Sequence, residues 1–168
     1  MAERGMIPRM LSNIYRKSRA LEKASDGDTT VDVTMSYYEI YTDRVFDLLE
    51  PPEKRTPTGL PIREAEGGKT VVAGLSEVSC SGLKEFEVLY DKANANRSVG
   101  ATKLNAESSR SHAILCVKVT INTATETRSS TISAIDLAGS EDNRRTGNVK
   151  ERMVESNILT ISLWNGNL

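Results

Sequence analysis

The chain has 168 residues, a length that fits one ordinary domain with a buried core. Its 22 Lys and Arg residues nearly balance 23 Asp and Glu residues, so we expect neither nucleic acid nor an anionic membrane as a partner. No apolar run approaches the length that spans a bilayer, and the two cysteines, Cys80 and Cys116, predict reduced thiols in the cytoplasm instead of a disulfide framework.

Residues 1–59 predict one helix, two strands and a loop. Apolar side chains after Pro8 recur mostly at three- and four-residue steps, which predicts an amphipathic helix that ends before the turn sequence at 24–28. Residues 30–41 alternate large apolar with smaller or polar side chains and predict a strand, while 43–49 predict a second, short strand. Three of the five prolines fall in 50–59, which predicts a surface loop.

A Gly-Lys-Thr run at Gly68 raises the question of a phosphate-binding loop. The pattern G-x-x-x-x-G-K-[ST] would need glycine at position 63, which is Arg63. It would also need a helix after the loop, whereas the residues that follow Lys69 are typical of a strand. Because a Glu-Gly-Gly tip separates two strand-like segments, the sequence predicts a β-hairpin here.

The second half of the chain predicts a helix and two strong strands. Residues 81–97 have apolar side chains at helical spacing, with Ser81 in place to cap a helix that packs on a sheet. Residues 112–123 and 130–139 are the strongest predicted strands. A polar, basic loop follows, and a helical pattern that begins near Glu151 loses definition in 159–168.

Two stretches carry residues suited to chemistry. Residues 105–112, NAESSRSH, concentrate hydroxyls, an amide, a guanidinium and an imidazole, although alone they would also fit an ordinary polar loop. Residues 136–141, DLAGSE, end an apolar strand in Asp136 with glycine soon after, which is how phosphate-handling sheets hold Mg²⁺ and sense the terminal phosphate. Together the two stretches predict a phosphate-related site.

The two stretches, at this separation, resemble the switch I and switch II segments of kinesin motor domains. The stretches SYYEIYTDRVFDLLEP, GLPIRE, NANRSVGATKLNAESSRSHAI and RRTGNVKERMVES are similar to further kinesin segments. The resemblance makes residues 1–168 a single, truncated motor-like domain in which about 5–156 match and 157–168 are a divergent tail. The implied fold is α/β: a partial kinesin motor fold, with a mixed β-sheet of about half the family's central sheet flanked by helices.

The resemblance also implies roles for individual residues. The family binds ATP and Mg²⁺, and Ser109, Asp136 and Gly139 match its cofactor-binding positions, with Ser109 and Asp136 as those for Mg²⁺. In the family, Asn105 would support the attacking water, and Ser108 and Ser109 would lie near the terminal phosphate. Asp136 would anchor Mg²⁺ through water, and the amide of Gly139 would sense the phosphate. Arg110 and Glu141 would form a salt bridge between the two switches.

These 168 residues contain no G-Q-T-x-x-G-K-[ST] loop, so we expect no bound cofactor and no ATP hydrolysis by this chain alone. The expected function is a non-motile module of the cytoplasmic cytoskeleton that binds tubulin or another protein. The alternatives are a microtubule-stimulated ATPase whose P-loop half is supplied elsewhere and an inactive gene fragment. The strand at 130–139 should have an open edge, through which copies of the chain could self-associate. The expected partner-binding residues are Arg63, Lys69, Arg144, Arg145, Lys150 and Arg152.

Overall fold

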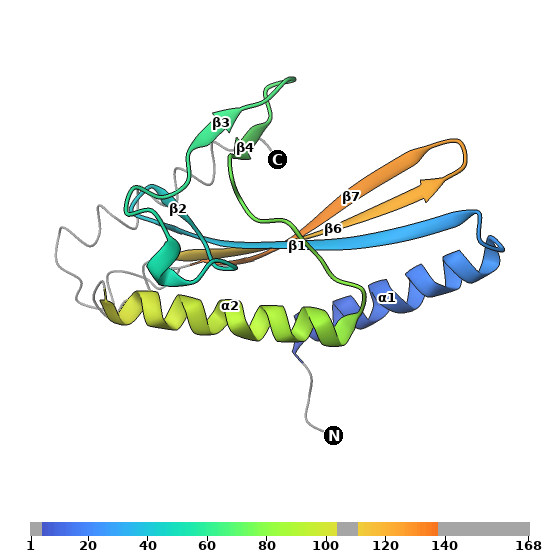
Figure 1. The fold of residues 1–168 in the computed structure, drawn as a ribbon, viewed down its shortest axis with the longest axis horizontal. Coiled ribbons are helices and arrows are strands. Elements are labelled where there is room, and N and C mark those ends of the chain that lie inside the picture. Colours follow the sequence, from blue (N-terminus) through green and yellow to red (C-terminus); the bar gives the residue numbers. More distant parts are fainter. Residues whose placement is uncertain (1–4, 104–110, 138–168) are drawn as a thin grey trace, which may run out of the picture.

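Two helices lie against one face of an antiparallel sheet in the computed structural model, which describes residues 5–103 and 111–137 (Figure 1). Neither helix is long and apolar enough to cross a membrane. The elements are α1 (Met6–Ala24), β1 (Thr29–Tyr41), β2 (Arg44–Asp47), a 3₁₀ turn (Pro52–Lys54), β3 (Ile62–Glu64), β4 (Thr70–Val72), β5 (Val78–Ser79), α2 (Leu83–Lys103), β6 (His112–Thr123) and β7 (Thr127–Asp136).

The main sheet is built around β1 and β6. Its strand order is β2-β1-β6-β7, and the short β5 pairs with β1 on the edge that β2 also uses. β1 and β6 pair along nearly their whole length, from Thr29 opposite Thr123 to Ile40 opposite His112. The predicted α/β class and its partial coverage of the fold are confirmed. A mixed sheet was expected, however, and every pairing among the described strands is antiparallel.

The core lies between this sheet and the two helices. Alternate residues of β1 and β6, among them Met35 and Val117, point toward the helices and are fully buried. α1 contributes Leu11 and α2 contributes Phe86 to the same cluster. Burying a large apolar side chain contributes about 1.5–3 kcal/mol, so this layer supplies the main driving force for folding.

A buried hydrogen bond closes the side of this core where β5 enters α2. The hydroxyl of Tyr15 donates to the backbone carbonyl of Cys80 at 3.0 Å. Both cysteines are free, and burial raises the pKa of the Cys80 thiol to about 11, so the thiol stays protonated at neutral pH. Ser81, the predicted helix cap, instead donates its hydroxyl and its amide to the Glu85 carboxylate at 2.7 and 2.8 Å.

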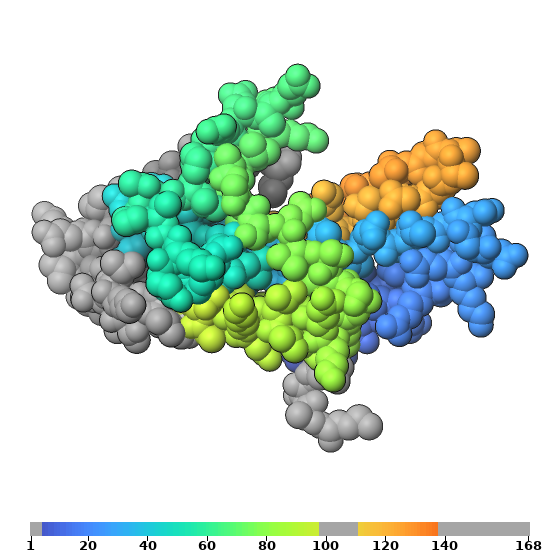
Figure 2. Space-filling model, viewed as in Figure 1, coloured from blue at the N-terminus to red at the C-terminus, as the bar shows by residue number. Residues whose placement is uncertain are grey.

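The Gly-Lys-Thr run lies in a β-hairpin, as predicted. β3 and β4 pair antiparallel, and the turn between them places Gly67 and Gly68 at φ angles of 80° and 74°, which glycine adopts at little cost. The amide of Ala65 donates to the carbonyl of Lys69 at 2.7 Å and closes the turn. The hairpin stands out from the rest of the molecule in Figure 2. β4 begins directly after Lys69, whereas a phosphate-binding loop leads straight into a helix, so this run does not have the geometry of such a loop.

β7 is the outer strand of the described sheet. It pairs with β6 along its length, and no other described strand pairs with it. Its side chains are exposed except for the partly buried Ala134, and Ile132 and Ile135 are 41% and 48% exposed.

Candidate functional site

The candidate site begins with a row of three residues that crosses the sheet on its helix-facing side. Glu39 of β1 lies opposite Ala113 of β6, and Ala113 lies opposite Asp136, the last residue of β7. Directly opposed residues on neighbouring strands share one face of the sheet. The row thus carries two carboxylates separated by a methyl group, which leaves space between them for a side chain from the helix layer.

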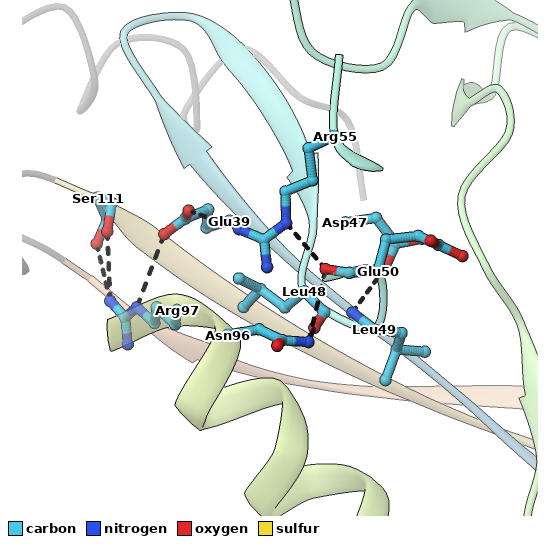
Figure 3. Close-up of polar contacts among 9 residues, drawn as sticks. All are labelled: Glu39, Asp47, Leu48, Leu49, Glu50, Arg55, Asn96, Arg97 and Ser111. Atoms are coloured by element: carbon cyan, nitrogen blue, oxygen red, sulfur yellow. Dashed lines mark hydrogen bonds and ion pairs between the residues drawn. The ribbon is translucent and has the colours of Figure 1, made fainter. Parts of the chain in front are cut away.

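Arg97 of α2 contacts both ends of this row. Its Nη1 donates to Asp136 Oδ2 at 3.0 Å, and its Nε lies 3.9 Å from Glu39 Oε2. Its Nη2 lies 3.2 Å from the backbone carbonyl oxygen of Ser111 and 3.4 Å from the hydroxyl of the same residue (Figure 3). A planar guanidinium offers donors in several directions, so one side chain joins α2 to β1, to β7 and to the residue that precedes β6.

A second arginine continues the network away from β7. Arg55, which follows the 3₁₀ turn, places Nη1 3.8 Å from Glu39 Oε1 and donates from Nε to the carbonyl of Glu50 at 3.0 Å. Asn96, next to Arg97 on α2, donates to the carbonyl of Leu48 at 2.9 Å (Figure 3). The loop after β2 is therefore fixed to the same end of α2 as the row of carboxylates.

Burial and charge act in opposite directions on this network. Burial raises the pKa of Glu39, while Arg55 and Arg97 work to lower it. Burial likewise lowers the pKa of Arg55, and the nearby carboxylates, Glu39 first among them, oppose that change. The carboxylate and the two guanidiniums thus depend on one another, because removing one leaves the others in a poorly solvated place without their main charge partner.

The lone histidine of the chain lies at the start of β6, beside this network. His112 is 3% exposed, and burial lowers its pKa. Asp136 acts in the other direction, since its carboxylate favours the imidazolium form. Because the chain has no other histidine, this balance can be measured directly.

Of the phosphate-site residues expected from the sequence, only Asp136 falls within the described residues. It ends β7, its side chain is 72% exposed, and its Oδ2 is bonded to Arg97. Sequence reasoning missed both Arg97 and Glu39. Glu39 could have been found from the alternation of β1, because it is an acidic residue at a position where the alternating pattern predicts a buried side chain. The residues outside the described ranges are Asn105, Ser108, Ser109, Arg110, Gly139 and Glu141.

Within the described ranges, Asp136 alone represents the Mg²⁺ positions expected from the sequence. No group of three or more His, Cys, Asp or Glu side chains that could hold a metal occurs within 5–103 and 111–137. The Oδ2 atom of Asp136 accepts a hydrogen bond from the Arg97 guanidinium, and the side chain of Asp136 is 72% exposed.

Two of the expected partner-binding residues are described, and both lie on the β3–β4 hairpin. Arg63 belongs to β3, Lys69 precedes β4, and both are exposed. The other four lie beyond the described part of the chain: Arg144, Arg145, Lys150 and Arg152.

Comparison with known proteins gives consistent matches. A family model described as the kinesin motor domain matches residues 1–165. The mouse kinesin-like protein KIF22 is 43% identical over 163 residues, which cover 95% of this chain and 24% of that protein. Human KIF13B is 35% identical over 166 residues, covering 95% of this chain and 9% of that protein. The chain thus spans about a quarter or less of the length of these relatives.

Solved structures agree with the sequence matches. The structure of a fast kinesin aligns with a TM-score of 0.76 and 32% identity over 92% of this chain and 42% of that one. The motor and motor homology domain of Kar3Vik1 aligns with a TM-score of 0.69 and 26% identity over 92% of this chain and 38% of that one. The described fold therefore corresponds to about two-fifths of each of these solved chains.

Replacing Arg97 should destabilise the protein more than replacing a surface cation. We expect Arg97→Ala to lower the free energy of unfolding by about 2–3 kcal/mol, because it removes the contacts of α2 with β1, β7 and Ser111 and removes a charge partner of Glu39. Lys118→Ala is the matched control: it removes a 3.0 Å ion pair to Glu77 whose side chains are 41% and 46% exposed, and should cost at most about 1 kcal/mol. Urea denaturation measures both, and equal losses would contradict the network described here.

The imidazole of His112 should titrate below its ordinary value of 6.5. A pKa lowered in the folded state means that this group contributes stability above pH 6.5, and that the contribution is lost as the pH falls below it. Proton NMR of the single histidine gives the midpoint. Asp136→Asn should lower the midpoint further, whereas Asp32→Asn, whose partner Asn122 lies at the far end of the sheet, should leave it unchanged. A midpoint that rises in Asp136→Asn would refute this assignment.

Proposed function

Because this chain belongs to the kinesin motor-domain family, we propose that its 168 residues form a tubulin-binding, switch-bearing part of such a domain that does not hydrolyse ATP alone. The observation that carries the proposal is the β3–β4 hairpin, in which the Gly-Lys-Thr run forms a turn and a strand instead of a phosphate loop. The proposed place of action is the microtubule cytoskeleton.

The argument against ATP binding rests on the residues that hold phosphate in P-loop enzymes. In such enzymes the loop amides and the loop lysine supply most contacts to the β- and γ-phosphates. The 168 residues contain no G-x-x-x-x-G-K-[ST] sequence. Each missing charge-assisted hydrogen bond is worth about 1.5–3 kcal/mol, so several together remove useful affinity.

Arg97 gives the proposed switch segments a common anchor. Ser111 directly follows 104–110, which contains most of the proposed switch I residues, and Asp136 begins the proposed switch II stretch. One guanidinium bonds to both residues. Such an arrangement suits two segments that change together, with Arg110 and Glu141 as the proposed salt bridge between them. Asn105, Ser108, Ser109 and Gly139 complete the proposed set.

The hairpin is the proposed tubulin contact among the described residues. It stands apart from the body and carries Arg63 and Lys69 in exposed positions. Basic side chains on a projecting hairpin would complement an acidic surface on the partner. The fast-kinesin structure, to which this chain is similar, was described in relation to interactions with microtubules, which supports the choice of partner.

A second candidate function is a microtubule-stimulated ATPase whose P-loop half is supplied elsewhere. The specific observation in its favour is that Arg97 bonds to both Asp136 and Ser111. The residues next to the two proposed switch segments are thus held together by a side chain of this chain. The same fast-kinesin structure was described in relation to an ATPase mechanism.

Microtubule co-sedimentation tests the proposed partner. The chain should pellet saturably and equally with and without ATP. Arg63→Glu/Lys69→Glu should weaken binding at least about tenfold, because two attractive contacts become repulsive. The matched control, Lys84→Glu/Lys92→Glu, changes the charge equally at two exposed positions of α2 and should bind as the parent does. Failure of the parent to pellet would favour an inactive fragment, and equal weakening by both variants would remove the hairpin from the interface.

Titration with a fluorescent ATP analogue tests the absence of nucleotide binding. We expect no saturable signal, with or without Mg²⁺. Tight, Mg²⁺-dependent binding would refute this part of the proposal, and phosphate release stimulated by microtubules would establish the second candidate function instead.

A further inference from the structure

The loop between β2 and β3 contains the one position in the chain where a hydroxyl residue precedes proline. Pro57 follows Thr56, whereas the other prolines follow isoleucine, glutamate, proline or leucine. Two basic residues, Lys54 and Arg55, come directly before Thr56. A threonine before proline, with basic residues upstream, has the form of an acceptor for a proline-directed protein kinase. The fold then decides whether an enzyme can reach this hydroxyl.

The loop is held at both ends and exposed in the middle. The Arg55 side chain is only 9% exposed and forms the ion pair with β1 described above. On the other side of the loop, the amide of Leu60 donates to the carbonyl of Val45 at 2.7 Å. Residues 56–58, between these two anchors, are all exposed. The fold thus presents Thr56 on the surface of the described molecule.

The Thr56 hydroxyl takes part in a turn. It donates to the carbonyl oxygen of Gly59 at 3.1 Å, and the amide of Gly59 donates to the carbonyl of Thr56 at 3.0 Å. Pro57 occupies the second place of this turn, a position that proline favours. A neutral hydrogen bond of this kind contributes only about 0.5–1.5 kcal/mol. Pro57 therefore has a structural reason to be here, and the hydroxyl beside it can still be released to an enzyme at a small cost.

A guanidinium lies beside Thr56, where it could pair with a phosphate. Arg44, at the start of β2, is exposed and donates from Nη1 to the carbonyl of Pro57 at 3.0 Å. The exposed charges that precede Thr56 in the loop, Glu53 and Lys54, have opposite signs. A phosphothreonine carries a charge of about −1.5 to −2 at pH 7 and accepts hydrogen bonds most strongly from guanidinium groups. The loop and the start of β2 thus supply both an acceptor hydroxyl and a partner for its phosphate.

We propose that Thr56 is phosphorylated by a proline-directed protein kinase and that Arg44 binds the phosphate. The kinase supplies Mg²⁺ and ATP. Thr56 Oγ1 forms a bond to the γ-phosphorus, the bond from that phosphorus to the β-phosphate oxygen breaks, and ADP leaves. The hydroxyl proton passes to the catalytic aspartate of the kinase. Neither tubulin binding nor nucleotide binding by this chain is required.

Phosphorylation in vitro tests the site. The chain, incubated with a cyclin-dependent kinase and ATP, should gain one phosphate, and peptide mass spectrometry should place it on Thr56. Pro57→Ala should slow the incorporation at least about tenfold, because a pocket shaped for proline loses its contacts. Thr58→Ala, a small change on the other side of Pro57, is the matched control and should be phosphorylated as the parent is.

Three results would overturn the site. The first is phosphate on another residue only. The second is phosphate on a peptide of residues 50–61 but not on the folded chain, because the fold would then hide the hydroxyl. The third is an equal rate for Pro57→Ala and the parent, because the enzyme would then not be reading the proline.

Phosphorus NMR of the phosphorylated chain tests the role of Arg44. The second pKa of a phosphothreonine is ordinarily about 6, and a neighbouring guanidinium lowers it because it favours the dianion. Arg44→Gln should therefore raise the midpoint by about 0.2–0.7, the equivalent of an exposed ion pair. Arg128→Gln, the same change at the opposite end of the sheet, should leave it unchanged. An unchanged midpoint in Arg44→Gln would show that Arg44 does not bind the phosphate.

Discussion

The antiparallel pairing of β1 with β6 is the constraint on which the rest of the structure depends. The two strands pair from Thr29 opposite Thr123 to Ile40 opposite His112, and every other strand of the main sheet pairs with one of them. Their alternation decides which side chains enter the helix layer, so a slip of one residue would turn Met35 and Val117 toward the other face. The same register places Glu39, Ala113 and Asp136 in one row.

That row explains why an arginine lies in a largely apolar layer. Glu39 and Asp136 flank the small Ala113, and Arg97 reaches both carboxylates while it bonds to Ser111 at the entry to β6. A buried network of this kind contributes less to stability than an apolar core of the same volume, but it breaks as a unit when one member is removed. The network includes Ser111, which follows 104–110 in the sequence, and Asp136, which begins the proposed switch II stretch, and this connects the fold to the proposed function.

Much of the fold could be predicted from local patterns. The alternation at 30–41 and 112–123 predicted both central strands, and the glycine-rich tip predicted the hairpin that Gly67 and Gly68 form. The first helix begins at Met6, slightly before the expected start, because proline is tolerated in a first turn whose amides need no partner within the helix. Such features depend on residues close together in the sequence.

What could not be predicted depends on residues far apart in the sequence. The strand patterns do not specify direction, so the fully antiparallel pairing of the described sheet was not foreseen. The placement of both helices on one face was not foreseen either. In the sequence, β2 to β5 and the first part of α2 separate Glu39 from Arg97, and neither residue forms a local motif. Asp136 was identified through a family motif, but its bond to Arg97 follows only from the register of three strands.

Amide hydrogen exchange tests the central place of the β1–β6 pairing most directly. If that pairing supports the whole sheet, the amides of Leu115 and Val117 should exchange only through global unfolding, about a hundredfold or more slower than those of the β3–β4 hairpin. Exchange from β6 as fast as exchange from the hairpin would contradict the account, because the row beneath Arg97 would then have no stable strands to hold it.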